Sequence, residues 1–339
     1  MVRNTFVPRI EYLILFVTHR CPLECRHCFV DQAPLDGPEL TVKEAGRIAQ
    51  ALNPLTWLDI GGGEPFLRRD LVDLVAPFRA RQIGIPTNGW FVDETIGTAR
   101  NLHGRLGNRL LICVSLEGFR NTHDSLRGEG SFDRAMATFQ GLQGIDGLRI
   151  VVNSTLTSVN HAELPEFMRW MRERKPFAHL VNILRGRPHD PEVVLPPLHE
   201  IRQFRDAFLG GSGPSDYGWD GPFARLLSVL SDRYVRQKWM VAMRVLEEGR
   251  QVLPCRAGRT SLVVYANGDV APCELLPPVG NVRSTPLPDI LAGPAMAGAR
   301  KRIRARECHC THECNMAGNA FLNLFGFLRV MSMREKKRR

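Results

Sequence analysis

The sequence predicts an α/β protein in which six parallel strands alternate with helices, followed by a small α+β extension. Two observations carry this prediction. Between residues 10 and 184, short and almost wholly apolar runs alternate with segments of helical periodicity, and such strands are typical of a parallel sheet that is buried on both faces. Beyond residue 250, the pattern changes to a hairpin and a stretch rich in Cys and His.

Each element is predicted from its own pattern. Apolar runs predict strands at 10–17, 56–60, 83–87, 109–116, 148–156 and 179–184. Helical spacing predicts helices at 41–52, 69–82, 93–104, 131–143 and 162–174, with Thr41 as the N-cap of the first and a kink at Pro77 in the second. We expect a Pro- and Gly-rich linker over 186–222 with one helix near 197–209, then a helix over 222–248. Asn267 and Gly268 predict the turn of a hairpin over 260–273.

Composition and charge exclude several classes of protein. The 339 residues are 44% hydrophobic and 24% charged, which is ordinary for a globular enzyme and excludes a disordered, collagen-like or fibrous chain. No run approaches the ~20 apolar residues of a membrane span, and no signal-peptide cleavage pattern follows the first apolar run, so we expect a cytoplasmic location. The net charge of +10 is concentrated in 300–306 and 329–339. A nucleic-acid binder would carry a broad basic face, so we expect no nucleic-acid partner.

Three cysteines follow the first predicted strand with a spacing that indicates a catalytic metal site. Cys21, Cys25 and Cys28 lie in one loop, and their thiolates suffice for three irons of a 4Fe–4S cluster, which takes four ligands when complete. A missing protein ligand leaves a position for a small molecule, as catalytic metal sites require. A zinc site closed by His19 or His27 is the alternative.

Further polar residues follow later strands, where parallel barrels carry their chemistry. Gly62, Gly63, Glu64 and Pro65 follow the second strand, and glycines allow a ligand to approach the backbone closely. Ser115 and Asn153 on the fourth and fifth strands are further candidate ligand contacts. Two interpretations stay open for two other residues: Asn88 is a contact or a turn former, and Arg127 is a contact or a surface charge.

The cysteine loop and the Gly-Gly-Glu-Pro segment resemble the radical S-adenosylmethionine (radical SAM) superfamily over about residues 10–185. The resemblance implies a partial (β/α)6 TIM-like barrel in which Cys21, Cys25 and Cys28 hold a 4Fe–4S cluster. Two residues depart from the usual pattern. His27 stands where the family usually has an aromatic residue, and Glu117 stands where it usually has Asp.

The resemblance also implies a cofactor and a reaction. Gly62, Gly63, Glu64 and Pro65, with Ser115 and Asn153, are expected to contact SAM. An external one-electron reductant of the flavodoxin or ferredoxin type would drive cleavage of SAM to methionine and a 5′-deoxyadenosyl radical, which abstracts a hydrogen atom from the substrate. The cofactors carry this chemistry, and the protein orients the reactants.

A second group of cysteines lies near the end of the chain. It consists of Cys255, Cys273, Cys308, Cys310 and Cys314. The interleaved His309 and His312 leave zinc open as an alternative. Gly268, five residues before Cys273, and the closing pair Cys310-x3-Cys314 resemble the Twitch/SPASM extension of radical SAM enzymes. This implies one auxiliary 4Fe–4S cluster, for which we expect Cys255, Cys273, Cys310 and Cys314 as ligands and Cys308 as a spare or substitute. Cys113, within an apolar strand, is expected to be a core residue.

These features predict four segments. They are a radical SAM core over 8–190, a helical linker region over 191–250, an auxiliary-cluster domain over 251–319, and an apolar helix with a basic tail over 320–339. The last segment either packs against the barrel or gives weak association with an anionic membrane surface, to which each basic residue contributes about 1 kcal/mol.

The predicted function is hydrogen abstraction leading to oxidation, epimerisation or bond formation. A sugar, an aminocyclitol or a lipid-linked small molecule is the expected substrate, because the nine residues before the first strand cannot form a domain that grips a leader peptide. A peptide-modifying maturase is the alternative within the enzyme class, and a non-enzymatic zinc-binding interaction protein is the alternative outside it. Arg185, after the sixth strand, either meets an anion or is a surface charge.

Overall fold

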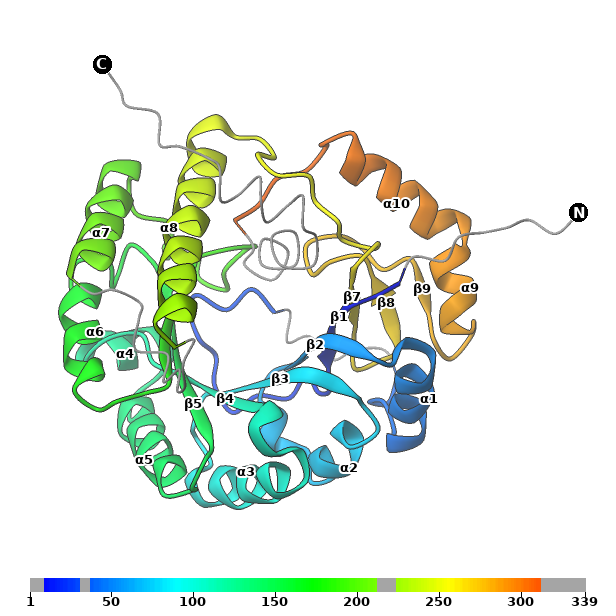
Figure 1. The fold of residues 1–339 in the computed structure, drawn as a ribbon, viewed down its shortest axis with the longest axis horizontal. Helices are drawn as coiled ribbons and strands as arrows, with labels where there is room; N and C mark the ends of the chain where they lie inside the picture. The colour runs from blue at the N-terminus through cyan, green and yellow to red at the C-terminus, as the bar shows by residue number, and fades with distance from the viewer. Residues whose placement is uncertain (1–8, 31–36, 212–223, 312–339) are drawn as a thin grey trace, which may run out of the picture.

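The computed structural model describes residues 9–30, 37–211 and 224–311. Six parallel strands, β1 to β6, form the barrel part of its sheet, with their helices on the outer side of the curve (Figure 1). The strands are β1 Tyr12–Phe16, β2 Leu55–Gly61, β3 Ala80–Thr87, β4 Leu110–Ser115, β5 Arg149–Leu156 and β6 Ala178–Ile183. The predicted α/β class with a partial parallel barrel is confirmed.

The helices follow the strands in the order expected of a βα barrel. They are α1 Val42–Leu52, α2 Leu71–Val75, α3 Val92–Leu106, α4 Arg120–Arg127, α5 Ser131–Gln143, α6 Leu164–Arg172, α7 Leu198–Gly211 and α8 Ala224–Glu248. Two short 3-10 turns, η1 Pro65–Leu67 and η2 Gly107–Arg109, complete the core. The predicted N-cap at Thr41 is confirmed, because its side chain accepts from the backbone of Glu44, whose carboxylate accepts from the Thr41 backbone.

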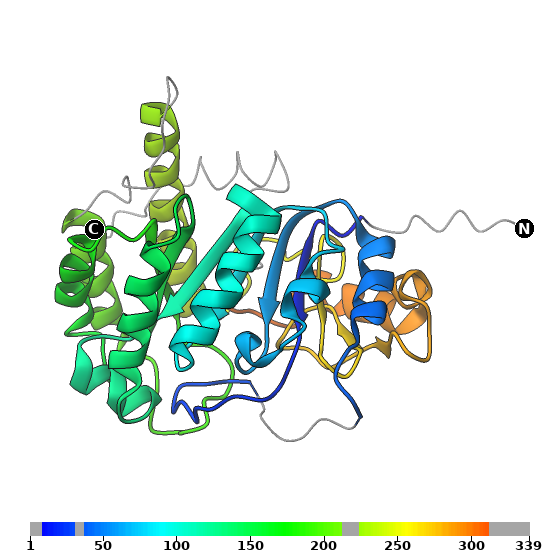
Figure 2. The ribbon, with the colours of Figure 1, turned by 90° about the horizontal axis from the view of Figure 1, so that it is seen from below.

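The extension continues the barrel sheet. Its elements are β7 Ser261–Val264, β8 Asp269–Ala271, β9 Gly280–Asn281, α9 Leu287–Ala292 and α10 Pro294–Arg304. Strand β7 pairs in parallel with β1, whereas β8 and β9 add antiparallel strands, so one sheet has the order β6-β5-β4-β3-β2-β1-β7-β8-β9. The hairpin turn predicted at Asn267 and Gly268 is confirmed, since Gly268 has φ +89° and donates to Tyr265. Figure 2 shows this extension (yellow to orange) beside β1 (blue), on the side away from the green helices.

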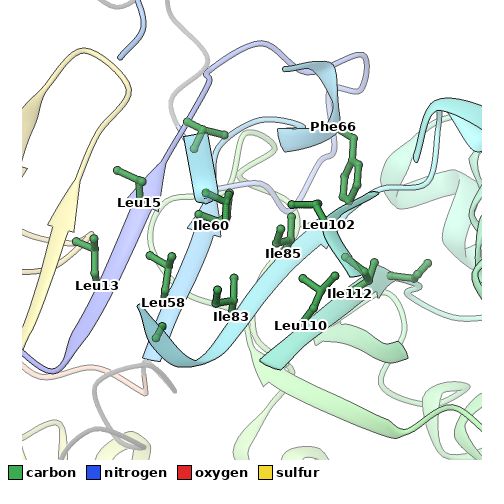
Figure 3. Close-up of a cluster of buried hydrophobic side chains, with 14 of the residues drawn as sticks. Leu13, Leu15, Leu58, Ile60, Phe66, Ile83, Ile85, Leu102, Leu110 and Ile112 are labelled. Carbon is green, nitrogen blue, oxygen red and sulfur yellow. The ribbon is translucent and has the colours of Figure 1, made fainter. Parts of the chain in front are cut away.

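The two faces of the barrel sheet differ in chemistry. Successive residues of a strand point to opposite faces, and the outer face is apolar where it packs on the helices (Figure 3). Its buried residues include Leu13, Leu15, Leu58, Ile60, Ile83, Ile85, Leu110 and Ile112. The alternate residues on the concave face include Asp59, Ser115 and Asn153, which lie in register with residues of neighbouring strands. The concave face thus carries polar side chains beside apolar ones such as Ile14 and Phe16, and these polar side chains suit a binding site.

The predicted end of one helix is wrong, and so is its predicted kink at Pro77, which lies in a turn after the helix. The sequence predicts a helix over 69–82, but α2 ends at Val75 and β3 begins at Ala80. The side chain of Asn53 explains the early end, because it donates to the carbonyl of Pro77 and accepts from the backbone of Arg79. These bonds turn the chain so that Ala80 pairs with Leu55. The structure also contains α4, α9 and α10, which the sequence patterns do not predict.

The structure tests only part of what we expect for membrane spans and for the end of the chain. No helix among the described ranges is both long and apolar enough to cross a membrane. The predicted apolar helix and basic tail over 320–339 lie outside the described residues, as does Cys314.

Candidate functional site

The first cysteine loop begins directly after β1, at the carboxyl end of the barrel strands. Cys25 is buried with 7% of its surface exposed, and Cys21 and Cys28 are half-buried. Burial raises the pKa of the Cys21 thiol to about 11 and also raises the pKa values of Cys25 and Cys28. The metal-free loop therefore carries thiols at neutral pH, and binding of a metal to the thiolates releases protons.

Two side-chain N–H donors are directed at sulfur atoms of this loop. The Asn88 amide nitrogen lies 3.5 Å from Cys21 Sγ, and Arg127 Nη1 lies 3.7 Å from Cys25 Sγ. Hydrogen bonds to ligand sulfurs stabilise the charge of an iron–sulfur cluster and tune its potential. Three thiols on one loop, with donors facing two of them, fit an iron–sulfur cluster that has one iron without a protein ligand.

The glycines after β2 allow this strand to pack against the cysteine loop. A Cβ atom on Gly62 would lie 2.4 Å from the Thr18 carbonyl oxygen, and one on Gly63 would lie 2.3 Å from the Arg20 carbonyl oxygen. The backbones are also joined by hydrogen bonds, Gly63 to Thr18 at 3.0 Å and Glu64 to Arg20 at 2.9 Å. The glycines therefore allow the end of β2 to pack on the backbone of the cysteine loop. Direct contact of Gly62, Gly63 and Pro65 with SAM stays a prediction.

Glu64 connects the ends of β2 and β3. Its side chain is 1% exposed and accepts hydrogen bonds from the backbone of Phe66 at 3.1 Å and of Asn88 at 2.7 Å. Burial raises the pKa of Glu64 to about 7, although the two backbone donors act in the opposite direction. The carboxyl group therefore holds Asn88 beside Cys21 and titrates near neutral pH.

A buried ion pair lies next to Cys25. Glu117 is fully buried after β4, and Arg127, at the end of α4, has only 12% of its side chain exposed. Arg127 Nη2 lies 2.6 Å from Glu117 Oε1, and the Thr155 backbone donates to Glu117 Oε2 at 2.6 Å. Burial acts to raise the pKa of Glu117, but Arg127, His27 and the Thr155 backbone donor together outweigh it and bring this pKa well below the ordinary value. Arg127 is thus no surface charge. The sequence does not reveal its role, because α4, which carries it, is not predicted.

Ser115 and Asn153 lie side by side on the concave face. They are register partners at the ends of β4 and β5, and the Asn182 side chain of β6 donates to Asn153 Oδ1 at 2.9 Å. Ser115 is buried and Asn153 is half-buried. Their hydroxyl and amide groups line one side of the barrel mouth, and their contact with SAM stays a prediction.

Arg185 bridges the two cysteine-rich regions. Its guanidinium lies 4.8 Å from the ring centroid of Phe29, the neighbour of Cys28, and 3.9 Å from Glu274 Oε2, the neighbour of Cys273. The following segment is bound to the loop, since the His189 backbone donates to the Cys28 carbonyl at 2.9 Å. Arg185 is therefore an internal ion-pair partner and not a freely solvated surface charge.

Four cysteines of the extension contribute to the lining of one cavity of about 320 Å³. They are Cys255, Cys273, Cys308 and Cys310. Much of the remaining lining is apolar, and burial raises the pKa of Cys273 to about 12. Cys308 thus lies with the predicted ligands. A cavity with four thiols suits a cluster that is fully bound by protein. Cys113 lies apart in β4, where burial raises the pKa of its thiol to about 12.

The fold and these two sites define an iron–sulfur enzyme with a catalytic cluster at a barrel mouth and a second cluster in the extension. Residues 15–171 match the model of the Radical SAM superfamily, and residues 255–315 match the model of the SPASM iron–sulfur cluster-binding domain. The chain belongs to the radical SAM superfamily and carries a C-terminal SPASM domain. Its cofactors are SAM, a 4Fe–4S cluster and an auxiliary SPASM cluster, and the zinc-binding interpretations are set aside.

Similar proteins include a pre-heme d1 synthase and two proteins whose structures hold bound peptides. The pre-heme d1 synthase of Dinoroseobacter shibae is 27% identical over 328 residues, which cover 89% of this chain and 80% of that protein. Two solved structures share the fold. Native anSMEcpe with bound AdoMet and a Kp18Cys peptide has a TM-score of 0.61 at 15% identity, covering 86% of this chain and 83% of that one. Streptococcus suis SuiB bound to precursor peptide SuiA has a TM-score of 0.61 at 17% identity, and the match covers 86% of this chain but only 66% of SuiB, just under two thirds of its length.

Proposed function

We propose that this radical SAM enzyme abstracts a hydrogen atom from a small non-peptide molecule bound on the concave face of the barrel. The observation that carries this proposal is that Arg185, which follows β6, bridges the two thiol sites through its contacts with Phe29 and Glu274. A substrate seated there contacts the polar ends of β4 to β6 and lies between the two clusters. The auxiliary cluster is then placed to accept an electron from an oxidised substrate.

The chain's own residues prepare this reaction. Cys21, Cys25 and Cys28 would hold the catalytic cluster, and Asn88 and Arg127 donate toward its sulfurs. The bound cluster and SAM supply the one-electron cleavage that generates a hydrogen-abstracting radical. An external donor of the flavodoxin or ferredoxin type supplies the electron. Packing of the Gly62–Gly63 segment on the loop fixes the loop against the barrel.

The substrate class is supported by the similarity to pre-heme d1 synthase, which spans most of both chains. The name of that enzyme indicates a small-molecule product. Ser115, Asn153 and Asn182 offer hydroxyl and amide groups that suit carboxylates or hydroxyls of such a molecule. Carboxylated tetrapyrroles are therefore the first class to test. The sugars, aminocyclitols and lipid-linked molecules expected from the sequence are the next.

A peptide substrate is the second candidate. It is favoured by the peptides bound in the anSMEcpe and SuiB structures. Their identity to this chain, 15% and 17%, supports the shared fold but not a shared substrate.

Transfer of deuterium distinguishes these candidates. The reconstituted enzyme is incubated without oxygen with SAM, dithionite and deuterated tetrapyrrole carboxylates, sugars or peptides, and the 5′-deoxyadenosine formed is analysed by mass spectrometry. We expect deuterium in 5′-deoxyadenosine from a non-peptide compound. Deuterium from peptides alone would contradict the proposed substrate class while leaving the radical chemistry in place.

A further inference from the structure

Arg127 places a positive charge next to one ligand of the catalytic cluster. Its Nη1 atom donates to Cys25 Sγ at 3.7 Å. Among the contacts of the described loop, Cys21 has the neutral Asn88 amide as its side-chain donor at 3.5 Å, and Cys28 Sγ lies 4.0 Å from the Val30 carbonyl. The three thiols therefore face different electrostatic surroundings, and the charged donor faces Cys25.

Glu117 fixes the direction in which Arg127 points. Arg127 Nη2 and Nε lie 2.6 Å and 3.0 Å from Glu117 Oε1, which leaves Nη1 facing the sulfur. Glu117 is held in turn by the Thr155 backbone at 2.6 Å, and its own backbone donates to His123 Nδ1 at 3.1 Å. A planar guanidinium bound along one edge has little freedom to turn away.

Glu117 and the end of α4 contact the loop at two further points. His27 Nε2, next to Cys28 in sequence, lies 3.4 Å from Glu117 Oε1. The Arg26 backbone donates to the Leu126 carbonyl at 2.9 Å, so the end of α4 is bound to the loop beside Arg127. The distance from the guanidinium to Cys25 is thus set by the fold and not by a flexible side chain.

We propose that Arg127, oriented by Glu117, is a positioning residue that sets the reduction potential of the cluster held by Cys21, Cys25 and Cys28. A reduced cluster carries one more negative charge than an oxidised cluster, so a nearby cation and N–H donor stabilise the reduced form and raise the potential. Arg127 thereby eases transfer of the first electron from the external donor. This inference rests on the family's cluster and is independent of the proposed substrate.

The test is a redox titration of the reconstituted full-length protein, followed by electron paramagnetic resonance. The signal that changes when SAM is added reports the catalytic cluster and separates it from the auxiliary cluster. For Arg127→Gln we expect the equilibrium constant for one-electron reduction to fall at least tenfold, which is about 59 mV. Arg127→Lys keeps the charge and is expected to recover part of this loss.

Arg149→Gln is the matched control. Arg149 begins β5, at the opposite end of the barrel, and donates to Gln82 at 3.0 Å. The substitution removes the same charge from a half-buried position, so it is expected to leave the potential unchanged. A wild-type potential in Arg127→Gln with full iron content would overturn the proposal, because a merely structural role does not move the potential.

A second variant tests the effect of charge on the reduction potential if Arg127→Gln fails to assemble the cluster. In Glu117→Gln the side-chain oxygen can still accept the hydrogen bonds that orient Arg127, whereas the opposing negative charge is removed, so the potential is expected to rise. An unchanged or lower potential in this variant would also overturn the proposal.

Discussion

Glu64 carries its carboxyl group into the interior between β2 and β3, where burial raises its pKa from 4.5 to about 7. The folded metal-free chain thus holds this proton more tightly than the unfolded chain does. The resulting stabilisation is fully present below pH 4.5 and is lost as the pH rises through 7. The shift corresponds to at most about 3 kcal/mol.

Replacing Glu64 with Gln is expected to reduce this pH dependence. The free energy of unfolding of the metal-free wild type should fall between pH 5 and pH 8 by more than that of Glu64→Gln, as measured by urea denaturation under reducing conditions. Asp73→Asn, at a residue whose side chain is 61% exposed, is the control and should behave as the wild type. Equal pH dependence in wild type and Glu64→Gln would contradict the assigned burial.

The close packing around Gly63 leads to a second prediction for a single residue. A methyl group there would lie 2.3 Å from the Arg20 carbonyl oxygen, so Gly63→Ala must displace the cysteine loop or the end of β2, at a cost of about 1–3 kcal/mol. We expect a lower iron content at the catalytic site after reconstitution. Gly97→Ala is the control, because no atom lies within 4 Å of its added methyl group and Ala favours a helix. Normal iron content in Gly63→Ala would show that the close packing is not required.

Among the helices and strands, the sequence predicts best those whose pattern lies within their own residues. The apolar runs predict β1 to β6, and the capping residues predict α1 with its N-cap at Thr41. Pro77 signals a break in α2, but its sequence does not decide between a kink and an end, because the turn after Val75 depends on Asn53, which bonds across from the loop before β2. Helix α4 could not be predicted either, because its eight residues are mostly polar and it shows no extended apolar stripe.

Some residues of the candidate site are predicted by the sequence, and others are brought together only by the fold. The spacing of Cys21, Cys25 and Cys28 predicts their shared role from sequence alone, and the family match supports it. The buried Arg127–Glu117 pair could not be predicted, because Arg127 lies at the end of a helix that the sequence pattern does not reveal. Likewise, only the fold brings Cys308 to the cavity that Cys255 and Cys273 line.

Helix α1 connects the barrel to the extension through Glu44. Its carboxylate completes the cap at Thr41 and accepts from Arg283 at 2.7 Å, and the hydrogen bond from Arg283 lowers the pKa of Glu44 to about 2. This contribution is present above pH 4.5 and is lost as the pH falls through 2. We expect Glu44→Gln to reduce the stability at pH 7 by about 1 kcal/mol, a value discounted for solvent screening, and by less at pH 3.

Urea midpoints at pH 7 and pH 3 measure this difference. Glu94→Gln is the matched control, because Glu94 occupies the corresponding position in the first turn of α3 and is exposed. A destabilisation of Glu44→Gln that is no larger than that of Glu94→Gln would show that the contact between α1 and Arg283 contributes nothing measurable.

At the scale of the whole molecule, one sheet carries both thiol sites. Strand β7 pairs with β1, so the extension is hydrogen-bonded to the strand that leads into the cysteine loop. Arg185 adds a second connection between the two regions. We infer that the auxiliary site is fixed relative to the barrel mouth, as electron transfer between a substrate and that cluster requires.

We expect the loop after β1 to hold a cluster with an open iron that cleaves SAM. The most direct measurement is the 5′-deoxyadenosine formed from SAM and dithionite by the anaerobically reconstituted chain, together with its iron content. We expect about eight irons per chain and formation of 5′-deoxyadenosine. Replacing Cys21, Cys25 and Cys28 with Ala should leave about four irons and abolish the product. A fully reconstituted wild type that forms no 5′-deoxyadenosine, or a triple variant that still forms it, would contradict the claim.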